Sequence, residues 1–372
     1  MKSSYFLEQN FNSSHFWRIG KIFNNIIFRA EKKIMINLIS DTVTKPTSAM
    51  LQKMMAAEVG DDVFRQDSTV NALEERMASM FGKEAALFCP SGTMTNQIAI
   101  KMHTQPLDEV ICDHYSHVYQ YETGGYAFNS GVAMNLITGV NGKITADQVE
   151  QHIRGDYDWL PQSRLVVLEN SCNKGGGSYY TIDEIKPITR LCKDKDLKLH
   201  LDGARLFNVL VETQESTEAV GAQFDSISIC LSKGLGAPVG SVLIGDSEDI
   251  RKARRFRKVM GGGMRQAGYL AAACLYALDH NVERLKVDND RAKRIGKLLA
   301  NQQWVKSVKP VRTNIVIFEV EAGMDASACV GLFSAKGIGC SAFGPQEVRF
   351  VFHLDISDED VEVIERTLKE LI

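Results

Sequence analysis

Short apolar runs alternate with helical segments along most of this chain, and this alternation restricts its possible folds more than any other feature. The apolar runs, each a candidate strand, cover residues 84–89, 109–112, 132–138, 164–169, 197–201, 225–231 and 239–244. Between them lie segments with helical spacing or polar composition, at residues 93–102, 147–154 and 183–195. Strands separated by such helices predict an α/β fold, in which a mostly parallel sheet is covered by helices on both faces.

The C-terminal part follows a different pattern. We expect one long helix at residues 264–303, then two strands at 314–320 and 348–354, and a final helix that begins with a capping box at Ser357. The sequence therefore predicts two domains, a large α/β domain and a small α+β domain, at residues 35–285 and 286–372.

Residues 1–34 are predicted to lie outside both domains. They hold six basic and two acidic residues, and asparagines interrupt their short apolar bursts. A secretory signal needs an unbroken apolar stretch of about 7 to 15 residues. We therefore expect these residues to be a disordered extension, or to stem from a start codon wrongly chosen upstream of Met35.

The composition argues against several classes of protein. The chain has 43 basic and 46 acidic side chains, and this net charge of −3 gives no field that would attract a nucleic acid. No apolar run reaches the roughly 18 to 20 residues of a membrane helix. The eight cysteines form no C-x-x-C pair, so we expect a cytoplasmic protein with reduced thiols and no metal site.

Polar residues follow several of the predicted strands, where ligands bind in open parallel sheets. Ser91, Gly92 and Thr93 join one strand to a helix. Glycine lets a backbone approach an anion, and the N–H groups and hydroxyls of this turn could hold that anion at the helix N-terminus. The same residues could instead serve only to cap the helix.

Two later strands are followed by single charged residues. Asp202 needs a cationic partner if it is buried, and this partner could be Arg205 or the nitrogen of a ligand. Lys233 lies among small and apolar residues, an environment that favours an amine acting as a nucleophile toward carbonyl groups. A solvated lysine in a surface turn is the alternative.

Two histidines follow the strand at 109–112. The H-x-x-H spacing of His114 and His117 occurs in metal sites, but no third ligand is spaced to match it. We expect His114 to be a surface histidine and the imidazole of His117 to lie over a ligand ring. An anion-binding turn, an acid, a nucleophilic lysine and a stacking ring together describe one cofactor, pyridoxal 5′-phosphate (PLP).

From about Met35 to its end, the chain resembles the low-specificity L-threonine aldolases of the PLP-dependent β-eliminating lyase group. These enzymes have the aspartate-aminotransferase type fold, PLP fold type I. The matching strings are SDTVTKPT (40–47), VGDDVF (59–64), EAALFCPSGT (84–93), H-x-Y-x-x-E-x-G-G (117–125), LEN (168–170), LHLDGARLFN (199–208), CLSKGLGAPVGS (230–241), RKVMGGGMRQ (257–266) and VRFVFHLD (348–355).

The resemblance implies a role for each candidate residue. Lys233 would bind the cofactor aldehyde, Asp202 would pair with the pyridine nitrogen, and His117 would stack on the ring. The phosphate would be held by Ser91, Gly92 and Thr93. The substrate carboxylate and the position of the cofactor would be fixed by Ser40, Arg205 and Arg349.

The resemblance also implies a homodimer or homotetramer, in which Lys258 and Arg265 flank a glycine-rich loop near the active site of a neighbouring subunit. The expected reaction is retro-aldol cleavage of L-threonine or L-allo-threonine to glycine and acetaldehyde.

One residue departs from the family pattern. Cys172 stands where typical aldolases have a histidine that contacts the β-hydroxyl group, and a neutral thiol is a poor replacement for imidazole as a base. His117, Lys233 or a water would then accept the hydroxyl proton. The departure leaves open β-elimination, or cleavage of a bulkier substrate such as phenylserine. A non-catalytic PLP-fold binding protein is a third hypothesis, but the complete set of candidate residues argues against it.

Overall fold

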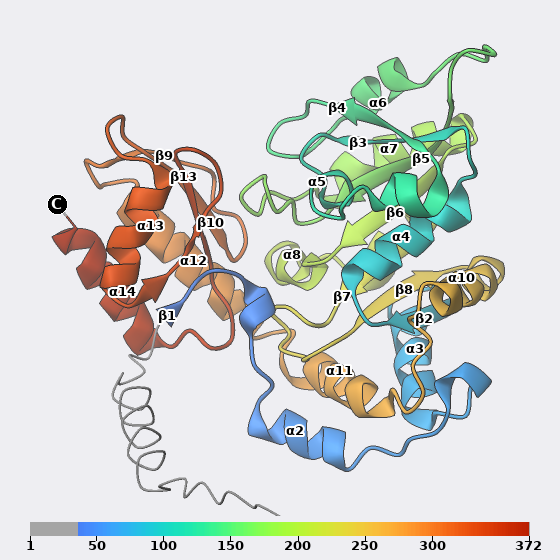
Figure 1. Cartoon of the computed structure of the whole chain (residues 1–372), viewed down its shortest axis with the longest axis horizontal. Helices are drawn as coiled ribbons and strands as arrows, with labels where there is room; N and C mark the ends of the chain where they lie inside the picture. Colours follow the sequence, from blue (N-terminus) through green and yellow to red (C-terminus); the bar gives the residue numbers. More distant parts are fainter. Residues whose placement is uncertain (1–35, 372) are drawn as a thin grey trace, which may run out of the picture.

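The predicted sheet is present, with seven strands in the order β2-β8-β7-β6-β5-β3-β4 (Figure 1). The computed structural model describes residues 36–371, so the extension expected at 1–34 lies outside the described residues. The strands are β2 (Ala85–Cys89), β3 (Asp108–Asp113), β4 (Ala133–Ile137), β5 (Gln162–Glu169), β6 (Lys198–Gly203), β7 (Ser226–Cys230) and β8 (Ser241–Gly245). Strand β8 is antiparallel to both of its neighbours, and the other strands share one direction. Six carboxyl ends therefore meet at one edge of the sheet.

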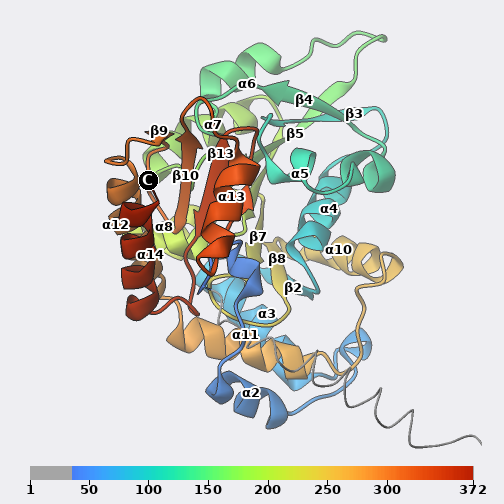
Figure 2. The same ribbon diagram turned by 60° about the vertical axis from the view of Figure 1, so that its left-hand side comes forward.

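Helices cover both faces of this sheet, as predicted (Figure 2). Because side chains alternate along a strand, Phe88 and Val166 pack on one face, and Leu87 and Leu165 pack on the other. The first face is covered by α2 (Ser48–Met55), α3 (Ser68–Met80), α6 (Ala146–His152), α7 (Ile182–Asp194), α8 (Leu206–Thr213), α9 (Thr217–Gly221) and α11 (Gly268–His280). The second face is covered by α4 (Gly92–His103), α5 (His117–Gln120) and α10 (Ser247–Val259).

The prediction of a single long helix at residues 264–303 is wrong. The structure has α11 and a separate α12 (Leu285–Leu299). Helix α11 ends where the side chain of Asn281 donates a hydrogen bond of 2.7 Å to the carbonyl oxygen of Leu235. The apolar pattern continues across the break, since Val282 still packs against the main core. Hydrophobic spacing therefore gave no sign of the interruption.

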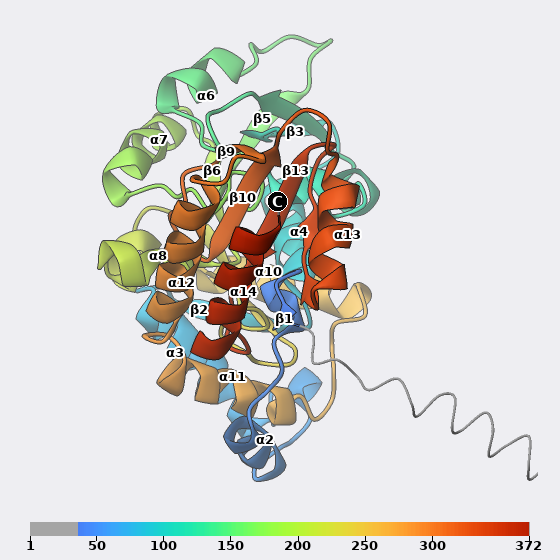
Figure 3. The ribbon, with the colours of Figure 1, turned by 90° about the vertical axis from the view of Figure 1, so that its left-hand side faces the viewer.

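A second, antiparallel sheet lies in the C-terminal part, in the order β12-β13-β10-β9. Its strands are β9 (Val305–Val308), β10 (Ile315–Val320), β12 (Ser341–Ala342) and β13 (Glu347–Val351), so β10 and β13 are the two strands expected there. A short parallel pair joins β1 (Ile36–Asn37) to β11 (Ile338–Gly339). Helices α12, α13 (Ala326–Ala335) and α14 (Asp358–Glu370) cover one face (Figure 3). Helix α14 begins with the expected capping box, in which Ser357 and Asp360 bond each other's backbone.

The alternation of β13 determines where one candidate residue points. Val348 and Phe350 pack against the three helices, in a core of their own. The ring of Phe350 meets those of Phe318 and Phe333 edge-on, with centroids 5.3 and 5.1 Å away. Arg349 stands between these two residues, so its side chain leaves the opposite face of the sheet. None of the described helices is long and apolar enough to cross a membrane.

We expect Phe350→Ala to lower the free energy of unfolding by about 3–5 kcal/mol, because it leaves a cavity in a fully buried aromatic cluster. Urea unfolding followed by fluorescence measures this loss. Phe128→Ala is the matched control, since that ring is 90 % exposed, and it should change stability by less than about 0.5 kcal/mol. Equal effects of the two substitutions would contradict the packing described here.

Candidate active site

One cavity at the carboxyl edge of the large sheet brings together six of the predicted residues. It has a volume of about 240 Å³ and is lined by Ser91, Gly92, Thr93, His117, Asp202 and Lys233, together with Thr42, Asn96, Ala204, Cys230 and Ser232. The six predicted residues follow strands β2, β3, β6 and β7. These strands run in the same direction, so side chains far apart in sequence meet at their ends.

The turn after β2 is both a helix cap and a wall of this cavity. Ser91 is the N-cap of α4, and its hydroxyl accepts a hydrogen bond of 3.2 Å from the backbone N–H of Met94. A Cβ atom on Gly92 would lie 2.5 Å from the sulfur of Cys230, so only glycine fits there. The first N–H groups of α4 have no partner within the helix, and this leaves them available to an anion.

Asp202 is a buried acid held by neutral donors. Its carboxylate accepts hydrogen bonds from the side-chain amide of Asn96 at 2.9 Å and from the backbone N–H of Ala204 at 3.2 Å. The sequence left Arg205 open as its partner, and that pairing is wrong. Arg205 instead donates two hydrogen bonds, of 2.6 and 2.7 Å, to Asp41. Within residues 36–371, Asp202 has no ion-pair partner.

The ion pair of Arg205 and Asp41 is itself buried. Burial would raise the pKa of Asp41, but the adjacent guanidinium lowers it to about 2. Two of the nitrogens of Arg205 are thus committed to Asp41. The structure brings Arg205 near the site without placing it on the cavity wall.

Lys233 is half-buried in the loop that follows β7. Its carbonyl oxygen accepts a hydrogen bond of 2.8 Å from the N–H of Gly236, and this turns the chain back on itself. In the part of the chain that the structure covers, the amine of Lys233 makes no hydrogen bond or ion pair. Lys233 therefore lines the cavity and is not a solvated lysine in a surface turn.

His117 is held from two sides. Its Nδ1 lies 2.9 Å from a carboxylate oxygen of Glu122, and its backbone N–H donates to Glu169 at 3.0 Å. Burial alone would lower the pKa of the imidazole, but the bond to Glu122 and the charges of Asp202 and Glu169 raise it above the ordinary value of 6.5. Burial, together with the charge of Asp202, raises the pKa of Glu169 to about 7.

One histidine and two acids beside the cavity also have the composition of a metal site. Ligand atoms of His117, Glu122 and Asp202 all lie within 4.8 Å of one another. Glu122, however, already accepts hydrogen bonds from Asn96 and Gln97 at 2.9 and 2.6 Å. Both carboxylates are satisfied by protein donors, so their arrangement is explained without an ion.

Arg349 crosses from the small sheet toward the large one. Its guanidinium donates to the side chain of Asn173 at 2.8 Å and to the carbonyl of Ile39 at 2.9 Å, and it lies 4.4 Å from the ring centre of Phe343. Burial and the charge of Arg205 lower its pKa to about 10. All these contacts are neutral and its Nε has no partner, which leaves a desolvated positive charge suited to a carboxylate.

Arg349 and three other predicted residues lie off the cavity wall. Ser40 is the N-cap of the short helix η1 (Asp41–Val43), next to the carbonyl of Ile39 that holds Arg349. Arg265 pairs with Asp61 at 2.9 Å, and Lys258 is exposed. A role for Lys258 or Arg265 in a neighbouring subunit stays a prediction.

Cys172 does not take the place of a catalytic base. Its thiol is buried and donates to the carbonyl oxygens of Glu169 and Gly142 at 3.0 and 3.4 Å. Burial also raises the pKa of this thiol far above its ordinary range. Among the described residues that line the cavity, His117 carries the one imidazole.

Sequence reasoning missed four residues that shape the site: Asp41, Asn96, Glu122 and Glu169. Three of them lie inside strings that carry the family resemblance, SDTVTKPT, H-x-Y-x-x-E-x-G-G and LEN. That position was the available signal. Asn96 had none, because a lone asparagine within a helical segment looks like any solvated residue.

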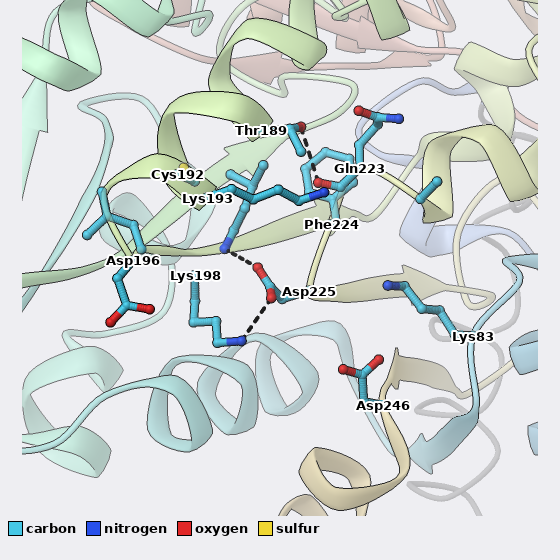
Figure 4. Close-up of a pocket in the computed structure, with 13 residues that line it drawn as sticks. Lys83, Thr189, Cys192, Lys193, Asp196, Lys198, Gln223, Phe224, Asp225 and Asp246 are labelled. Atoms are coloured by element: carbon cyan, nitrogen blue, oxygen red, sulfur yellow. Dashed lines mark hydrogen bonds and ion pairs between the residues drawn. The ribbon is translucent and has the colours of Figure 1, made fainter.

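A second cavity lies at the opposite edge of the large sheet, where β6 and β7 begin (Figure 4). Its volume is about 310 Å³. Lys198 pairs there with Asp225 at 3.0 Å, and Asp225 also accepts the backbone N–H of Leu199 at 2.8 Å. The other charged residues around it are of both signs: Lys83, Lys193, Asp196 and Asp246. None of the predicted site residues lines this cavity.

The residues at the carboxyl edge fit PLP. The turn at Gly92 has no room for a side chain beside Cys230, and within residues 36–371 Asp202 has no cationic partner and the amine of Lys233 has no acidic one. These three features match the phosphate, the ring nitrogen and the aldehyde of the cofactor. Each has the opposite chemistry to the group it would receive.

Comparison with known proteins agrees with this assignment. The profile of the family described as Beta-eliminating lyase matches residues 37–323. A low specificity L-threonine aldolase of Escherichia coli (strain K12) is 40 % identical over 329 residues, which are 88 % of this chain and 96 % of that protein. A low-specificity L-threonine aldolase of Candida albicans is 38 % identical over 340 residues, 90 % of this chain and 89 % of that protein.

A solved structure of Leishmania major threonine aldolase superposes with a TM-score of 0.78 and 20 % identity, covering 90 % of this chain and 99 % of that one. At this identity the likeness establishes the fold. The predicted fold class, family and cofactor are confirmed, and the chain is a PLP-dependent lyase. It belongs to the β-eliminating lyase family.

Proposed function

We propose that this enzyme cleaves L-threonine, L-allo-threonine and related β-hydroxy-α-amino acids to glycine and an aldehyde. Relatives that carry the name of this activity match it over most of its length. The observation that carries the proposal is the cavity shared by an unpaired lysine amine, a buried acid and an anion-binding turn.

The proposed cofactor contacts divide among the segments that follow the strands. Lys233 would hold the aldehyde, Asp202 the pyridine nitrogen, His117 the ring face, and the turn from Ser91 to Thr93 the phosphate. When bound, PLP supplies an electron sink for the pair of electrons left when the Cα–Cβ bond breaks. Asp202 would serve this chemistry by accepting a hydrogen bond from the ring nitrogen.

The α-carboxylate of the substrate would bind to Arg349. An arginine fork holds a carboxylate through parallel hydrogen bonds, and among the described residues Nε of Arg349 has no hydrogen-bond partner. Ser40 follows Ile39, whose carbonyl oxygen accepts a hydrogen bond from Arg349, while Arg205 would act through Asp41 and through its positive charge. Binding the carboxylate compensates a charge that the protein leaves unpaired.

His117 is the proposed acceptor of the β-hydroxyl proton. Its Nδ1 is engaged by Glu122, so Nε2 is the atom left to face the cavity. Moving the hydroxyl proton to Nε2 lets the oxygen become the carbonyl of the departing aldehyde. The buried position of the Cys172 thiol supports this choice over a thiol base.

We also propose a homodimer or homotetramer. Phe64 and Val259 are 69 and 79 % exposed, near the neighbouring-subunit candidates Arg265 and Lys258, and a subunit interface would remove them from water. Light scattering of the purified protein tests this assembly. From the sequence alone, we also propose a cytoplasmic location and a boundary between the two domains at residues 285 and 286.

A product assay distinguishes this function from its runner-up. Acetaldehyde and glycine from L-threonine or L-allo-threonine support the proposal, and release from phenylserine alone would indicate a bulkier substrate. Ammonia and a keto acid without aldehyde would instead show β-elimination. A cofactor absorption band without turnover of any amino acid would favour a binding protein.

We expect Lys233→Ala to lose both the visible absorption of covalently held cofactor and acetaldehyde release, by several orders of magnitude. No other lysine lines the described cavity, so no second amine can replace it. Absorption spectroscopy and a coupled aldehyde assay measure the two losses. Lys83→Ala, at the second cavity, is the control and should keep both. Acetaldehyde release that persists in Lys233→Ala would refute the assignment of the amine.

The activity should fall as the pH is lowered through the pKa of His117, which lies above 6.5, because a protonated imidazole cannot accept the hydroxyl proton. Glu122→Gln removes a negative charge that raises this pKa. The acid limb of the kcat profile should therefore move to lower pH in Glu122→Gln. A limb that stays in place, or moves upward, would rule out His117 as the proton acceptor.

A further inference from the structure

A continuous chain of buried hydrogen bonds leads from Asp202 into the protein, away from the cavity. The side-chain amide of Asn96, on α4, donates to Asp202 and to Glu122, both at 2.9 Å. Its oxygen lies 3.2 Å from Nε2 of His200, on β6. The chain then passes through Ser226, at the start of β7, with His200 Nδ1 2.8 Å from the hydroxyl oxygen.

The last member of the chain is His103, at the end of α4. Its Nε2 lies 2.8 Å from the hydroxyl of Ser226, and its Nδ1 is 4.0 Å from a carboxylate oxygen of Asp249 on α10. The side chains of Asn96, His200, Ser226 and His103 are all buried. We call these four residues the Asp202 support chain.

The chemistry of the partners gives this chain a single direction. Ionised carboxylates only accept hydrogen bonds, so the Asn96 amide must direct its NH₂ to Asp202 and Glu122 and its oxygen to His200. His200 must then donate from Nε2 and accept at Nδ1 from the hydroxyl of Ser226. That hydroxyl has one hydrogen, so His103 must donate to it.

Every donor in the support chain thus points toward Asp202. Burial lowers the pKa of His200 to about 3 and that of His103 to about 4, so both rings stay neutral and the direction is fixed. Aligned hydrogen bonds polarise one another in a low-dielectric interior. The alignment favours the negative form of the carboxylate at its end.

We propose that the Asp202 support chain positions Asp202 and keeps it ionised against the cofactor nitrogen. Asn96 is the central residue, because the same amide also fixes Glu122 and, through it, the ring of His117. The proposal rests on the cofactor assignment and deepens the proposed function by naming positioning residues that act through Asp202.

The structure also offers a matched control. Thr95 and Ser228 form a buried hydrogen bond of 2.5 Å between α4 and β7, the elements that the support chain also joins. Ser228 is the register partner of Asp202, but its hydroxyl bonds Thr95 and not the carboxylate. A loss of packing between the two elements would appear in both sets of variants, whereas a loss of orientation would appear only in the support chain.

The test compares Asn96→Ala with Ser228→Ala as holoenzymes. Losing a hydrogen bond to a charged group corresponds to about a tenfold effect or more. In Asn96→Ala we expect a changed visible spectrum of the bound cofactor and a fall in kcat of about tenfold or more, with KM for L-threonine nearly unchanged. Ser228→Ala should keep the spectrum and kcat of the wild type. Equal behaviour of the two variants would overturn the proposal.

A second pair covers the case in which Asn96→Ala fails to fold. His200→Gln can still donate to Asn96, whereas His200→Leu cannot, so the spectrum and kcat should be preserved in the first variant and altered in the second. The absence of a difference between them overturns the proposal.

The outcomes also separate this proposal from the proposed function. If the wild type cleaves no β-hydroxy amino acid but Asn96→Ala still differs spectrally from Ser228→Ala, the aldolase function fails and the support chain stands. If the wild type releases acetaldehyde and Asn96→Ala matches it in both readouts, the support chain fails alone.

Discussion

A buried carboxylate that lacks a basic protein partner is the constraint on which the rest of this structure depends. Asp202 ends β6 directly opposite Glu169, which ends β5, and two adjacent buried acids are unfavourable unless donors or a shared proton compensate them. The protein provides both. Burial and the charge of Asp202 raise the pKa of Glu169 to about 7, which favours its protonated form, and Asn96 donates a hydrogen bond to Asp202. Because Asn96 and the anion-binding turn belong to α4, one helix serves both ends of the proposed cofactor site.

The opposite charge enters from the other sheet. Arg349 leaves the face of β13 that is not covered by helices and reaches Asn173, which follows β5. Arg205 is neutralised by Asp41, whereas Arg349 is surrounded by neutral groups. The site therefore has two buried acids, Asp202 and Glu169, on the large sheet. On the small sheet it has the positive charge of Arg349, which forms no ion pair within the described residues. This division suits a zwitterionic amino acid, whose amine and carboxylate need opposite partners.

The sequence was informative wherever function depends on the end of a strand. Alternating apolar runs located all seven strands of the large sheet, and the residues after them lie in one cavity. What it could not predict depends on contacts between distant segments. Arg205 looked like a partner for Asp202 because the two are close in sequence, yet it pairs with Asp41, which the fold brings beside it. The break between α11 and α12 depends on Asn281 reaching Leu235, and the importance of Asn96 depends on two carboxylates that only the folded chain places around it. The domain boundary stays a prediction.

The position of Arg349 has a consequence for how the enzyme would recognise its ligand. Arg349, the proposed holder of the carboxylate, and Lys233, the proposed holder of the cofactor aldehyde, belong to parts of the fold with separate hydrophobic cores. An amino acid bound to the cofactor through its amine and to Arg349 through its carboxylate would then bridge the large and the small sheet. A simple amine lacks the carboxylate, so it would bind at the cofactor alone and leave Arg349 without a ligand. The enzyme would thus select amino acids over amines because only an amino acid has a group for each of the two sheets.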